Sequence, residues 1–176
     1  MSNRRLLAMQ DVVRRTQMCI RDSVLCEWLL NNGKKIPELL NYAHDSKDSI
    51  KATCIEAIEY ASKQKPSIVD QRSFDVIAGF LQHKAPRVKW EAAKVIGNTA
   101  HLYQGKLNDA IELLLKNTNY DGTVVRWSAA YALGEIIKLP LHQDKKFLNK
   151  IRSIMEAEES NSIKKIYASA LKKIPK

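Results

Sequence analysis

The sequence has few of the residues that interrupt helices and few of the patterns that form strands. Its 176 residues include six Gly and five Pro. Side chains branched at Cβ rarely alternate with polar ones over the roughly four to eight positions that a strand needs. A chain of this length buries roughly two-thirds of its unfolded surface as one domain. We therefore predict an all-α fold that needs neither a metal nor a disulfide for stability.

Cysteine is scarce, and long apolar runs are missing. The three cysteines, Cys19, Cys26 and Cys54, form no C-x-x-C motif, which argues against both a disulfide framework and a zinc site. The longest purely apolar runs, such as Leu113 to Leu115, are far too short to cross a bilayer. The N-terminus also lacks the apolar core of a secretory signal. We expect a soluble, cytoplasmic protein with no membrane partner.

The sequence motifs of common enzymes are absent as well. The chain contains no G-x-x-x-x-G-K-[ST], G-x-G-x-x-G, G-x-S-x-G or H-E-x-x-H, and no carboxylate pair at a spacing that suggests acid–base catalysis. No i, i+4 pair and no nearby Cys accompanies the four histidines, His44, His83, His101 and His142. They are typical of surface residues rather than of a metal centre. We therefore predict a non-enzymatic protein without metal or cofactor.

One N-terminal segment differs in character from the rest of the chain. Met18 to Ser23, MCIRDS, is the translation of ATG TGT ATA AGA GAC AG, which resembles a transposon-end adapter used in sequencing libraries. We interpret residues 1–23 as read-through from such an adapter, with native sequence resuming near Val24. Without this segment the net charge falls from +10 to +7, because five arginines and two aspartates are removed. The protein is basic in either case.

The chain is rich, by contrast, in internal similarity. VKWEAAKVIGN, from Val88, returns as VRWSAAYALGE, from Val125, and two weaker copies align with them without a gap. The apolar anchors of the four copies lie 38, 37 and 38 residues apart and are Ile50, Val88, Val125 and Ile163. A period of this length indicates stacked supersecondary units, each too small to bury its own apolar face.

Each copy has the pattern of an amphipathic helix, and another amphipathic run precedes it. A basic residue follows the anchor, and apolar residues stand four, seven and eight positions after the anchor, which is one helical face. Short connectors with Gly, Pro or Asn separate the runs. We predict helix–turn–helix units over approximately residues 24–64, 65–103, 104–140 and 141–176. Expected at the starts of the second helices are Pro86 and the N-caps Asp48, Thr123 and Asn161.

The motif V-[KR]-W-x-A-A-x-[AV]-[IL]-G at the start of the second helix resembles HEAT repeats of the bacterial type, over about Ile36 to Ile174. The resemblance implies a right-handed α-solenoid of about four helix pairs, with the second helices on the concave side. Small side chains on the flank of the second helix, Ala93, Ala130 and Ala168, then permit close approach of neighbouring units.

The resemblance also implies a ladder of polar contacts between neighbouring units. In this ladder a base pairs with an acid that stands a few residues before it. The candidate bases are Lys51, Lys89, Arg126 and Lys164. Asp45, Asp121 and Glu158 match the acid loosely, whereas the second unit has His83 and Lys84 there. The bases are expected along the seam between units rather than at a ligand.

Helical geometry turns both tryptophans of the repeat away from the predicted core. Trp90 and Trp127 stand two positions after their anchors and point about 160° from the core centre at 3.6 residues per turn. One interpretation is a recognition groove on the concave face, formed by Trp90, Lys94, Trp127, Tyr131, Lys165 and Lys172. The alternative is packing, in which each indole lies flat over the neighbouring helix and covers Gly97 or Gly134.

From this groove we predict a small bacterial scaffold, expected to be monomeric, that binds a protein partner, with an acidic partner as one option. Nucleic-acid binding through the same basic, Trp-containing groove is the alternative. Alkylpurine DNA glycosylases built from HEAT-like helices place a catalytic aspartate between tryptophans, but this chain has Glu91 and Glu135 instead. A lyase or other modifier of a cofactor-bearing protein is a further class, on fold-level analogy alone. The Lys-rich end, KKIPK, is either a polar cap or part of a longer array.

Overall fold

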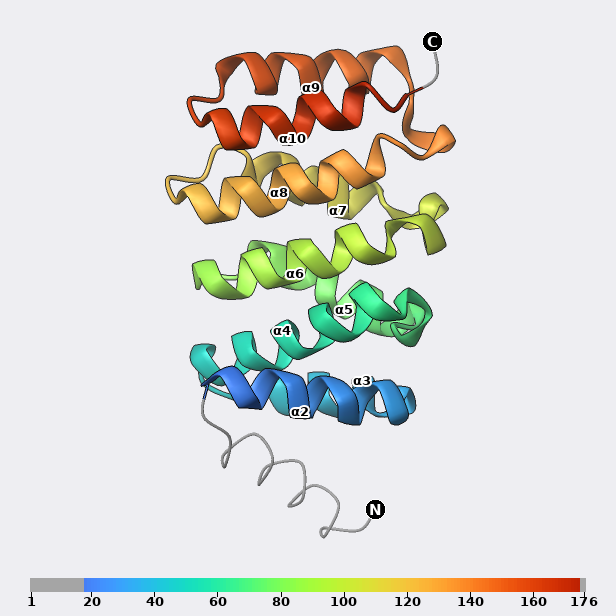
Figure 1. Ribbon diagram of the computed structural model, residues 1–176, viewed down its shortest axis with the longest axis vertical. Helices are drawn as coiled ribbons and strands as arrows, with labels where there is room; N and C mark the ends of the chain where they lie inside the picture. The colour runs from blue at the N-terminus through green and yellow to red at the C-terminus, as the bar shows by residue number, and fades with distance from the viewer. Residues whose placement is uncertain (1–17, 175–176) are drawn as a thin grey trace, which may run out of the picture.

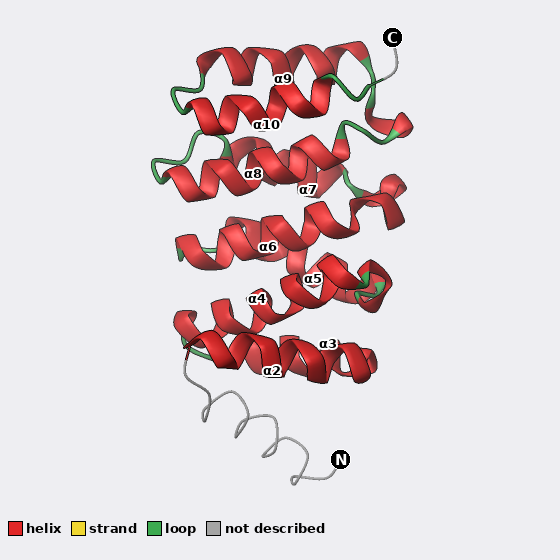
Figure 2. Ribbon diagram, in the orientation of Figure 1, coloured by secondary structure: helices red, strands yellow, loops and turns green. Residues whose placement is uncertain are grey.

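The structure, a computed structural model, describes residues 18–174, with side chains described from Leu25 onward. Within that range every regular element is a helix (Figure 2). The α-helices are α2 (Met18–Asn31), α3 (Ile36–His44), α4 (Asp48–Gln64), α5 (Gln71–Gly79), α6 (Pro86–Thr99), α7 (Asn108–Asn117), α8 (Thr123–Ile136), α9 (Lys145–Ala157) and α10 (Asn161–Leu171). None of these helices has the length and apolarity needed to cross a membrane. The interpretation of residues 1–23 falls mostly outside the described residues and stays a prediction.

The helices form a stack of antiparallel pairs (Figure 1). The pairs are α3–α4, α5–α6, α7–α8 and α9–α10, as the repeat predicts. In each pair the anchor is the third residue of the second helix, so that Ile50, Val88, Val125 and Ile163 occupy equivalent places. The prediction of an α-solenoid of four helix pairs is confirmed. Helix α2 packs on α4 and extends the same layer by half a pair.

The second helices make up one continuous layer, in which α4, α6, α8 and α10 follow one another up the stack (Figure 1). They contact one another far more extensively than the first helices do. The second helices thus form the more densely packed side of the stack, which is the side that the HEAT pattern implies to be concave. We call the side chains of these helices that point away from the first helices the second-helix face.

One apolar core runs through the whole stack, from Leu25 to Ala170. Burial is nearly complete at the anchors Val88, Val125 and Ile163, whereas Ile50 is half-buried. The predicted flank residues Ala93 and Ala130 are also buried, because the next unit covers them. The units therefore share one core, and no unit has a core of its own.

The starts of the second helices differ by one residue from the prediction. Pro86 is the first residue of α6, as expected. The three predicted N-caps are instead the first helical residues: Asp48, Thr123 and Asn161. The residues at the N-cap positions, Lys47, Gly122 and Ser160, make no side-chain cap bond. Side-chain caps occur on first helices, where Asp70 accepts from the Ser73 amide at 2.8 Å and Asp144 accepts from the Phe147 amide at 3.0 Å. The first helices lie at the outer layer, where such local bonds replace packing.

Two glycines stand at the same place in consecutive second helices, but their surroundings differ. A Cβ on Gly97 would lie 2.7 Å from Tyr131 Cε1 and 3.2 Å from the Ala132 Cα, closer than such atoms approach. A Cβ on Gly134 would lie 3.4 Å from the Ala170 Cβ, which is ordinary contact. Close approach of α8 to α6 therefore requires a glycine at 97, whereas α10 tolerates a methyl group at 134.

We predict opposite effects of the two Gly→Ala substitutions on the free energy of unfolding. Gly97→Ala lowers it by about 1–2 kcal/mol, because the inserted methyl group displaces a packed ring and a neighbouring backbone. Gly134→Ala raises it by up to about 1 kcal/mol, since alanine favours the helix and meets no obstacle. Urea denaturation of both variants checks this. Equal effects at the two positions would contradict the packing described here.

Candidate functional site

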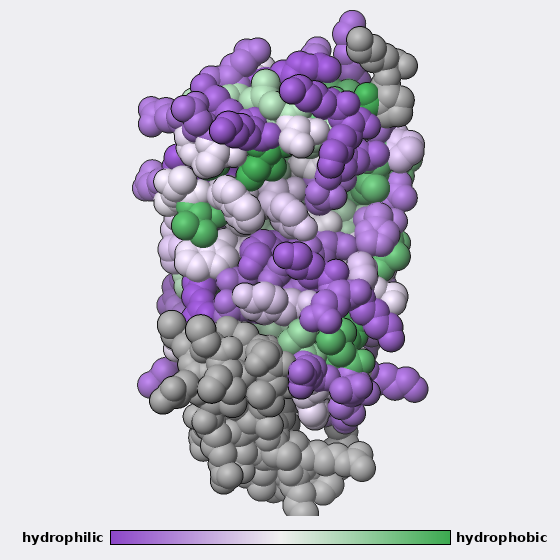
Figure 3. All heavy atoms as spheres, viewed as in Figure 1, coloured by the Kyte–Doolittle hydropathy of each residue, from purple (hydrophilic) through white to green (hydrophobic). Residues whose placement is uncertain are grey.

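Where grey atoms do not cover it, the second-helix face shows hydrophilic and intermediate side chains with small, separate hydrophobic areas (Figure 3). The largest exposed side chain of the repeat motif on it is Trp127, which is 38% exposed. The Trp127 ring lies parallel to the ring of Tyr131, one turn further along α8, with an interplanar angle of 3° and centroids 6.0 Å apart. The Tyr131 hydroxyl donates to Asn98 Oδ1 of α6 at 2.7 Å, and this hydrogen bond holds the Tyr131 ring in place. Trp127 is thus an exposed aromatic surface on a rigid support.

Trp90 is less available than Trp127. It is half-buried, and its indole N–H donates to Glu91 Oε1 at 2.6 Å. The packing alternative expected an indole over each glycine, but the atoms nearest the two glycines come from other side chains. Gly97 lies under the Tyr131 ring, and Gly134 faces α10. The reason is that each second helix is displaced along its neighbour in the stack. The residue opposite a glycine therefore lies one turn further along the facing helix than the indole does.

Lys94 is tied to two acids rather than free. Its Nζ lies 3.0 Å from Glu91 Oε2 and 3.2 Å from Glu59 Oε2 on α4, and both carboxylates are almost fully buried. Burial alone would lower the pKa of Lys94, but the two carboxylates outweigh burial and raise it. The ammonium group also lies 5.9 Å from the centre of the Tyr60 ring. The centre of the face therefore carries no excess positive charge.

The sequence analysis missed Glu59, Glu91 and Asn98 as members of this polar network. Asn98 joins the network by donating from Nδ2 to the Glu59 carbonyl at 3.2 Å and to Ser62 Oγ at 3.1 Å. The sequence does contain a signal for this network, because Glu59 stands at the repeat position where the next two units have glycine. A charged residue at a place of close approach requires an opposite charge on the facing helix. Lys94 meets that requirement.

The free cations of the face lie toward its C-terminal end. Lys165 and Lys172 are exposed, as is Lys173. An open groove of about 320 Å³ runs between α8 and α10, with Tyr131, Lys165 and Lys173 among its lining residues. Of the six predicted groove residues, the structure thus places Trp127, Tyr131 and Lys165 around one region. Trp90 and Lys94 belong to the polar network, and Lys172 lies at the C-terminal turn after α10.

Three of the four predicted ladder bases bind main-chain carbonyls at the end of the preceding helix or in the connection that follows it. Each side chain runs along the seam between units, and its apolar stem packs there. The acceptors are the carbonyls of His44 for Lys51 at 3.1 Å, Leu81 for Lys89 at 3.1 Å, and Tyr120 and Asp121 for Arg126 at 3.0 and 2.9 Å. The hydrogen bonds hold these three side chains at the seam between units.

The same bases also reach the next unit, where their acceptors differ. Lys51 Nζ lies 5.8 Å from the centre of the Phe80 ring. Lys89 Nζ donates to Asn117 Oδ1 at 3.1 Å and lies 5.4 Å from the centre of the Tyr120 ring. Aromatic faces and an amide of the next unit thus receive these two bases. Burial lowers the pKa of Lys89, which has no carboxylate to oppose it.

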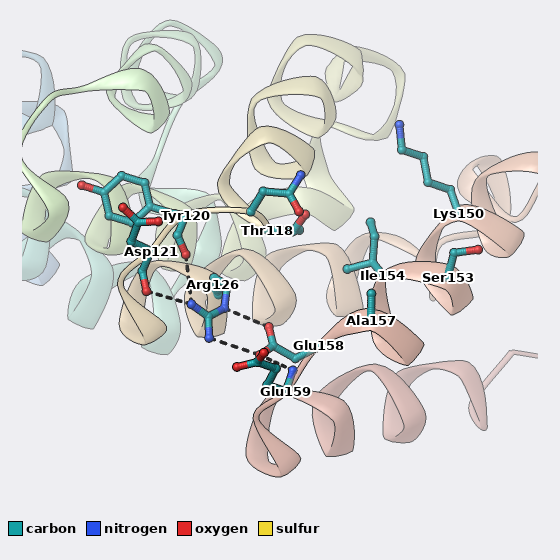
Figure 4. A pocket seen from close by; sticks show the side chains of 11 residues that line it. Thr118, Tyr120, Asp121, Arg126, Lys150, Ser153, Ile154, Ala157, Glu158 and Glu159 are labelled. Atoms are coloured by element: carbon teal, nitrogen blue, oxygen red, sulfur yellow. Dashed lines mark hydrogen bonds and ion pairs between the residues drawn. The ribbon is translucent and has the colours of Figure 1, made fainter.

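Arg126 makes the one bidentate contact with a carboxylate in the described ladder (Figure 4). Its Nε donates to Glu158 Oε2 at 3.0 Å and its Nη2 donates to Glu158 Oε1 at 3.2 Å. The sequence analysis named Asp121 as the acid, but Asp121 contributes its main-chain carbonyl. The carboxylate comes from the following unit, because the loop before each second helix meets the preceding unit. This pair lines an open groove of about 660 Å³ between the two loops.

Lys164, the last ladder base, differs from the other three. It is half-buried, and no acid or ring contacts it among the described residues. The histidines also differ from one another. His142 was predicted on the surface but is 8% exposed, with Nε2 at 2.8 Å from the Gln104 carbonyl. The described residues contain no cluster of His, Cys, Asp or Glu that could hold a metal.

Comparison with known proteins agrees with this architecture. The sequence profile of the family described as HEAT repeats matches residues 36–134, more than half of the chain. The chain belongs to the HEAT-repeat family. Among curated proteins this HEAT-repeat chain is similar to the bilin biosynthesis protein PecE of Nostoc sp. strain PCC 7120, with 30% identity over 146 residues. The match covers 82% of this chain and 49% of PecE, so the chain spans about half the length of that relative.

Two kinds of solved structure resemble this HEAT-repeat fold. A designed armadillo repeat protein in complex with the peptide (KR)4 superposes with a TM-score of 0.66 and 14% identity, over 94% of this chain and 80% of that one. The complex of CpcE and CpcF of phycocyanin lyase from Nostoc sp. PCC7120 gives a TM-score of 0.54 and 17% identity, over 78% of this chain and 98% of the matched chain. At these identities the likeness shows the fold alone.

We predict that the Arg126–Glu158 pair makes stability depend on pH. Burial raises the pKa of Glu158, but hydrogen bonds from Arg126 and from two amides outweigh burial and hold it below its ordinary 4.5. A carboxylate with a depressed folded-state pKa stabilises fully above its unfolded pKa and loses that contribution as the pH falls through the folded pKa. Glu158→Gln should therefore lower the free energy of unfolding by about 2 kcal/mol at pH 7.

The difference between wild type and Glu158→Gln should shrink as the pH falls below about 4.5, which denaturation curves at several pH values will show. Glu112→Gln is the matched control. Glu112 pairs with Lys116 at 2.7 Å on an exposed surface, so its loss should change stability little at any pH. A pH-independent effect of Glu158→Gln would contradict this role.

Proposed function

We propose that this HEAT-repeat protein is a non-enzymatic scaffold that binds a protein partner through its second-helix face, around Trp127 and Lys165. The observation that carries the proposal is the exposed Trp127 ring supported by Tyr131. A large, rigid aromatic side chain on a concave surface is the usual anchor of a protein contact. The similar solved structures support this use of the fold, because one contains a bound peptide and another a second protein.

The distribution of charge favours an acidic segment of that partner. Two carboxylates of the polar network neutralise the charge of Lys94. Lys51, Lys89 and Arg126 donate hydrogen bonds to main-chain carbonyls. The exposed lysines of α10 and its C-terminal turn are left to attract a ligand. We therefore place the partner's apolar anchor on Trp127 and its acidic residues over α10.

We predict that a photo-crosslinking residue at Val124 captures the partner, whereas the same residue at Val76 does not. The two side chains have similar exposure, 50% and 43%, but Val124 is on α8, one turn from Trp127, and Val76 is on the first helix α5. Once the captured protein is identified by mass spectrometry, Trp127→Ala should raise its Kd about 30-fold. Leu141→Ala, at a 64% exposed loop residue, should not.

Nuclease treatment and salt separate this proposal from nucleic-acid binding. Capture at Val124 should survive nuclease, and the affinity should change little with ionic strength if an aromatic anchor dominates. Nucleic-acid binding would weaken steeply with salt in proportion to the phosphates neutralised. Capture that disappears with nuclease, or equal capture from Val76, would overturn the protein-binding proposal.

A second candidate is a role in bilin attachment, which the 30% identity to PecE favours. A bilin is a conjugated linear tetrapyrrole that carries carboxylates. Trp127 offers a flat aromatic surface, and Lys165 stands at the same position of the next second helix. Stacking on the indole and pairing with Lys165 would suit a planar anion of this kind. In this case the chain would act as a part of a bilin lyase, as CpcE and CpcF act together in phycocyanin lyase.

We predict for this second candidate that a purified bilin, titrated into the protein, shows a shift in its absorbance band at low micromolar concentration. Trp127→Ala and Lys165→Ala should each weaken the binding about tenfold, since each removes one contact. Val76→Ala is the control, because it changes an exposed side chain of the other layer. Binding that is unchanged in both groove variants would remove bilin recognition from this face.

A further inference from the structure

The sixth residue after the anchor packs against the preceding second helix, and its size differs between the interfaces. In α6 this residue is Lys94, whose Nζ lies 3.2 Å from Glu59 Oε2 of α4. In α8 it is Tyr131, whose ring covers Gly97 of α6. In α10 it is Ser169. The interface between α8 and α10 therefore has a short side chain where the other two interfaces have a long or bulky one.

An open groove of about 320 Å³ lies at this place between α8 and α10. The two helices approach each other through small residues, since Gly134 lies against Ala170, and both residues line the groove. Lys165, Ser169 and Lys173 also line it. They follow one another at intervals of four residues, so they form one row along α10. The short side chain at 169 thus leaves a hollow with a lysine on either side.

This row faces the preceding helix α8, so its exposure does not depend on what packs on the opposite flank of α10. The equivalents of Lys165 and Lys173 in earlier second helices are Trp127 and Tyr60. Both stay exposed, by 38% and 44%, although another second helix follows each of them in the stack. The groove is therefore a property of the interface between α8 and α10.

The groove is positively charged. Three ammonium groups line it against one carboxylate, which leaves a net charge of +2, and they belong to Lys138, Lys165, Lys173 and Glu135. Lys138 pairs with Glu135. Lys165 and Lys173 are exposed, and no carboxylate pairs with them among the described residues. These two ammonium groups and the Ser169 hydroxyl are available to an anion.

We infer that this groove receives a phosphorylated serine or threonine of the partner, next to the apolar residue that the partner places on Trp127. The inference rests on the proposed function, because it names the acidic group expected over α10. A phosphomonoester carries about 1.5–2 negative charges and three acceptor oxygens at pH 7, which matches the charge of the groove. Lysine binds phosphate as a point charge, whereas the planar carboxylate is best bound by arginine, and no arginine lines the groove.

Tyr131 connects the groove with the aromatic surface. Its ring lines the groove and lies parallel to the Trp127 ring, with centroids 6.0 Å apart. An extended chain covers roughly 3.3 Å per residue. The partner's apolar residue on Trp127 therefore stands about two residues from the phosphorylated one.

The distribution of charge favours a phosphorylated protein over a nucleic acid. A nucleic-acid backbone carries a phosphate at every nucleotide, and its binding needs a positive track along the surface. At the centre of the second-helix face two almost fully buried carboxylates, Glu59 and Glu91, hold Lys94. Lys165 and Lys173 lie together in one groove instead, which suits a single phosphate group.

The test compares four end-blocked peptides, Leu-Gly-Xaa-Gly-Leu, in which Xaa is phosphoserine, serine O-sulfate, aspartate or serine. A leucine stands two residues from Xaa on each side, so either chain direction can reach Trp127. We expect the phosphoserine peptide to bind about tenfold more tightly than the sulfate peptide, which has the same shape and one charge less. Shifts of the amide NMR signals of α8 and α10 in the full chain measure each Kd.

The advantage of phosphoserine should depend on pH. The second pKa of a phosphomonoester is about 6, so at pH 5 the group is mostly singly charged. The phosphoserine and sulfate peptides should then bind alike. Equal affinities of the phosphoserine and aspartate peptides at pH 7 would overturn the inference, as would the absence of binding by all four peptides.

Three variants test the place of binding. Ser169→Tyr gives α10 the residue that α8 uses against Gly97, so it should close the groove and abolish the preference for phosphoserine with all lysines retained. Lys165→Gln should lower that preference about tenfold. Lys150→Gln removes the same charge from another groove and should leave the preference unchanged. Urea denaturation verifies the fold of each variant, and a preference that survives Lys165→Gln in the folded protein would refute this assignment.

Two further measurements separate this inference from the other proposals. An oligothymidylate that binds more tightly than the phosphoserine peptide would assign the lysines to a nucleic acid instead. Trp127→Ala should weaken all four peptides by a similar factor, because it removes the apolar contact that they share. Four equal affinities that all depend on Trp127 would overturn the phosphate site and keep the proposed function. Partner capture at Val124 decides the proposed function without any of these peptides.

Discussion

Close approach between successive second helices is the constraint on which this structure depends. Each helix pair is too small to bury its own apolar face, so its neighbour must complete the core. At the closest point the chain uses a different solution each time: a buried ion pair between Glu59 and Lys94, a ring against Gly97, and small side chains at Gly134. The continuous layer of second helices follows from this packing.

This packing also explains why a basic composition does not produce a basic face. Several basic side chains of the repeat contribute to the packing of the units. Lys51, Lys89 and Arg126 donate hydrogen bonds to main-chain carbonyls. Lys94 forms ion pairs with two buried carboxylates. Among the described residues of the second helices, exposed lysines that no such contact holds include those on α10 and its C-terminal turn. The position of a lysine within the repeat, rather than the net charge, decides whether it can bind a partner.

The period of the sequence was sufficient to predict the helix pairs, the equivalence of the anchors and the direction of Trp127, because these depend on one helix and its own core. Contacts between helices were harder to predict. The angle of a residue about its own axis does not give the height at which the next helix crosses it, so the cover of Gly97 was assigned to an indole instead of Tyr131. For the same reason Glu158 was not identified as the partner of Arg126, and His142 was placed on the surface.

The differences among the three interfaces give the stack a fixed order. If all interfaces were alike, a helix pair would dock equally well on any other, and the chain would have alternative registers of similar stability. Here the ion pair at Glu59 would meet no lysine on α8, and the Tyr131 ring needs a glycine that α4 lacks. The ladder changes in parallel, from a ring at Phe80 to a carboxylate at Glu158. The third interface, which has the least specific packing at Gly134, thus has the most directional polar contact, since a bidentate Arg–carboxylate pair sets both distance and angle.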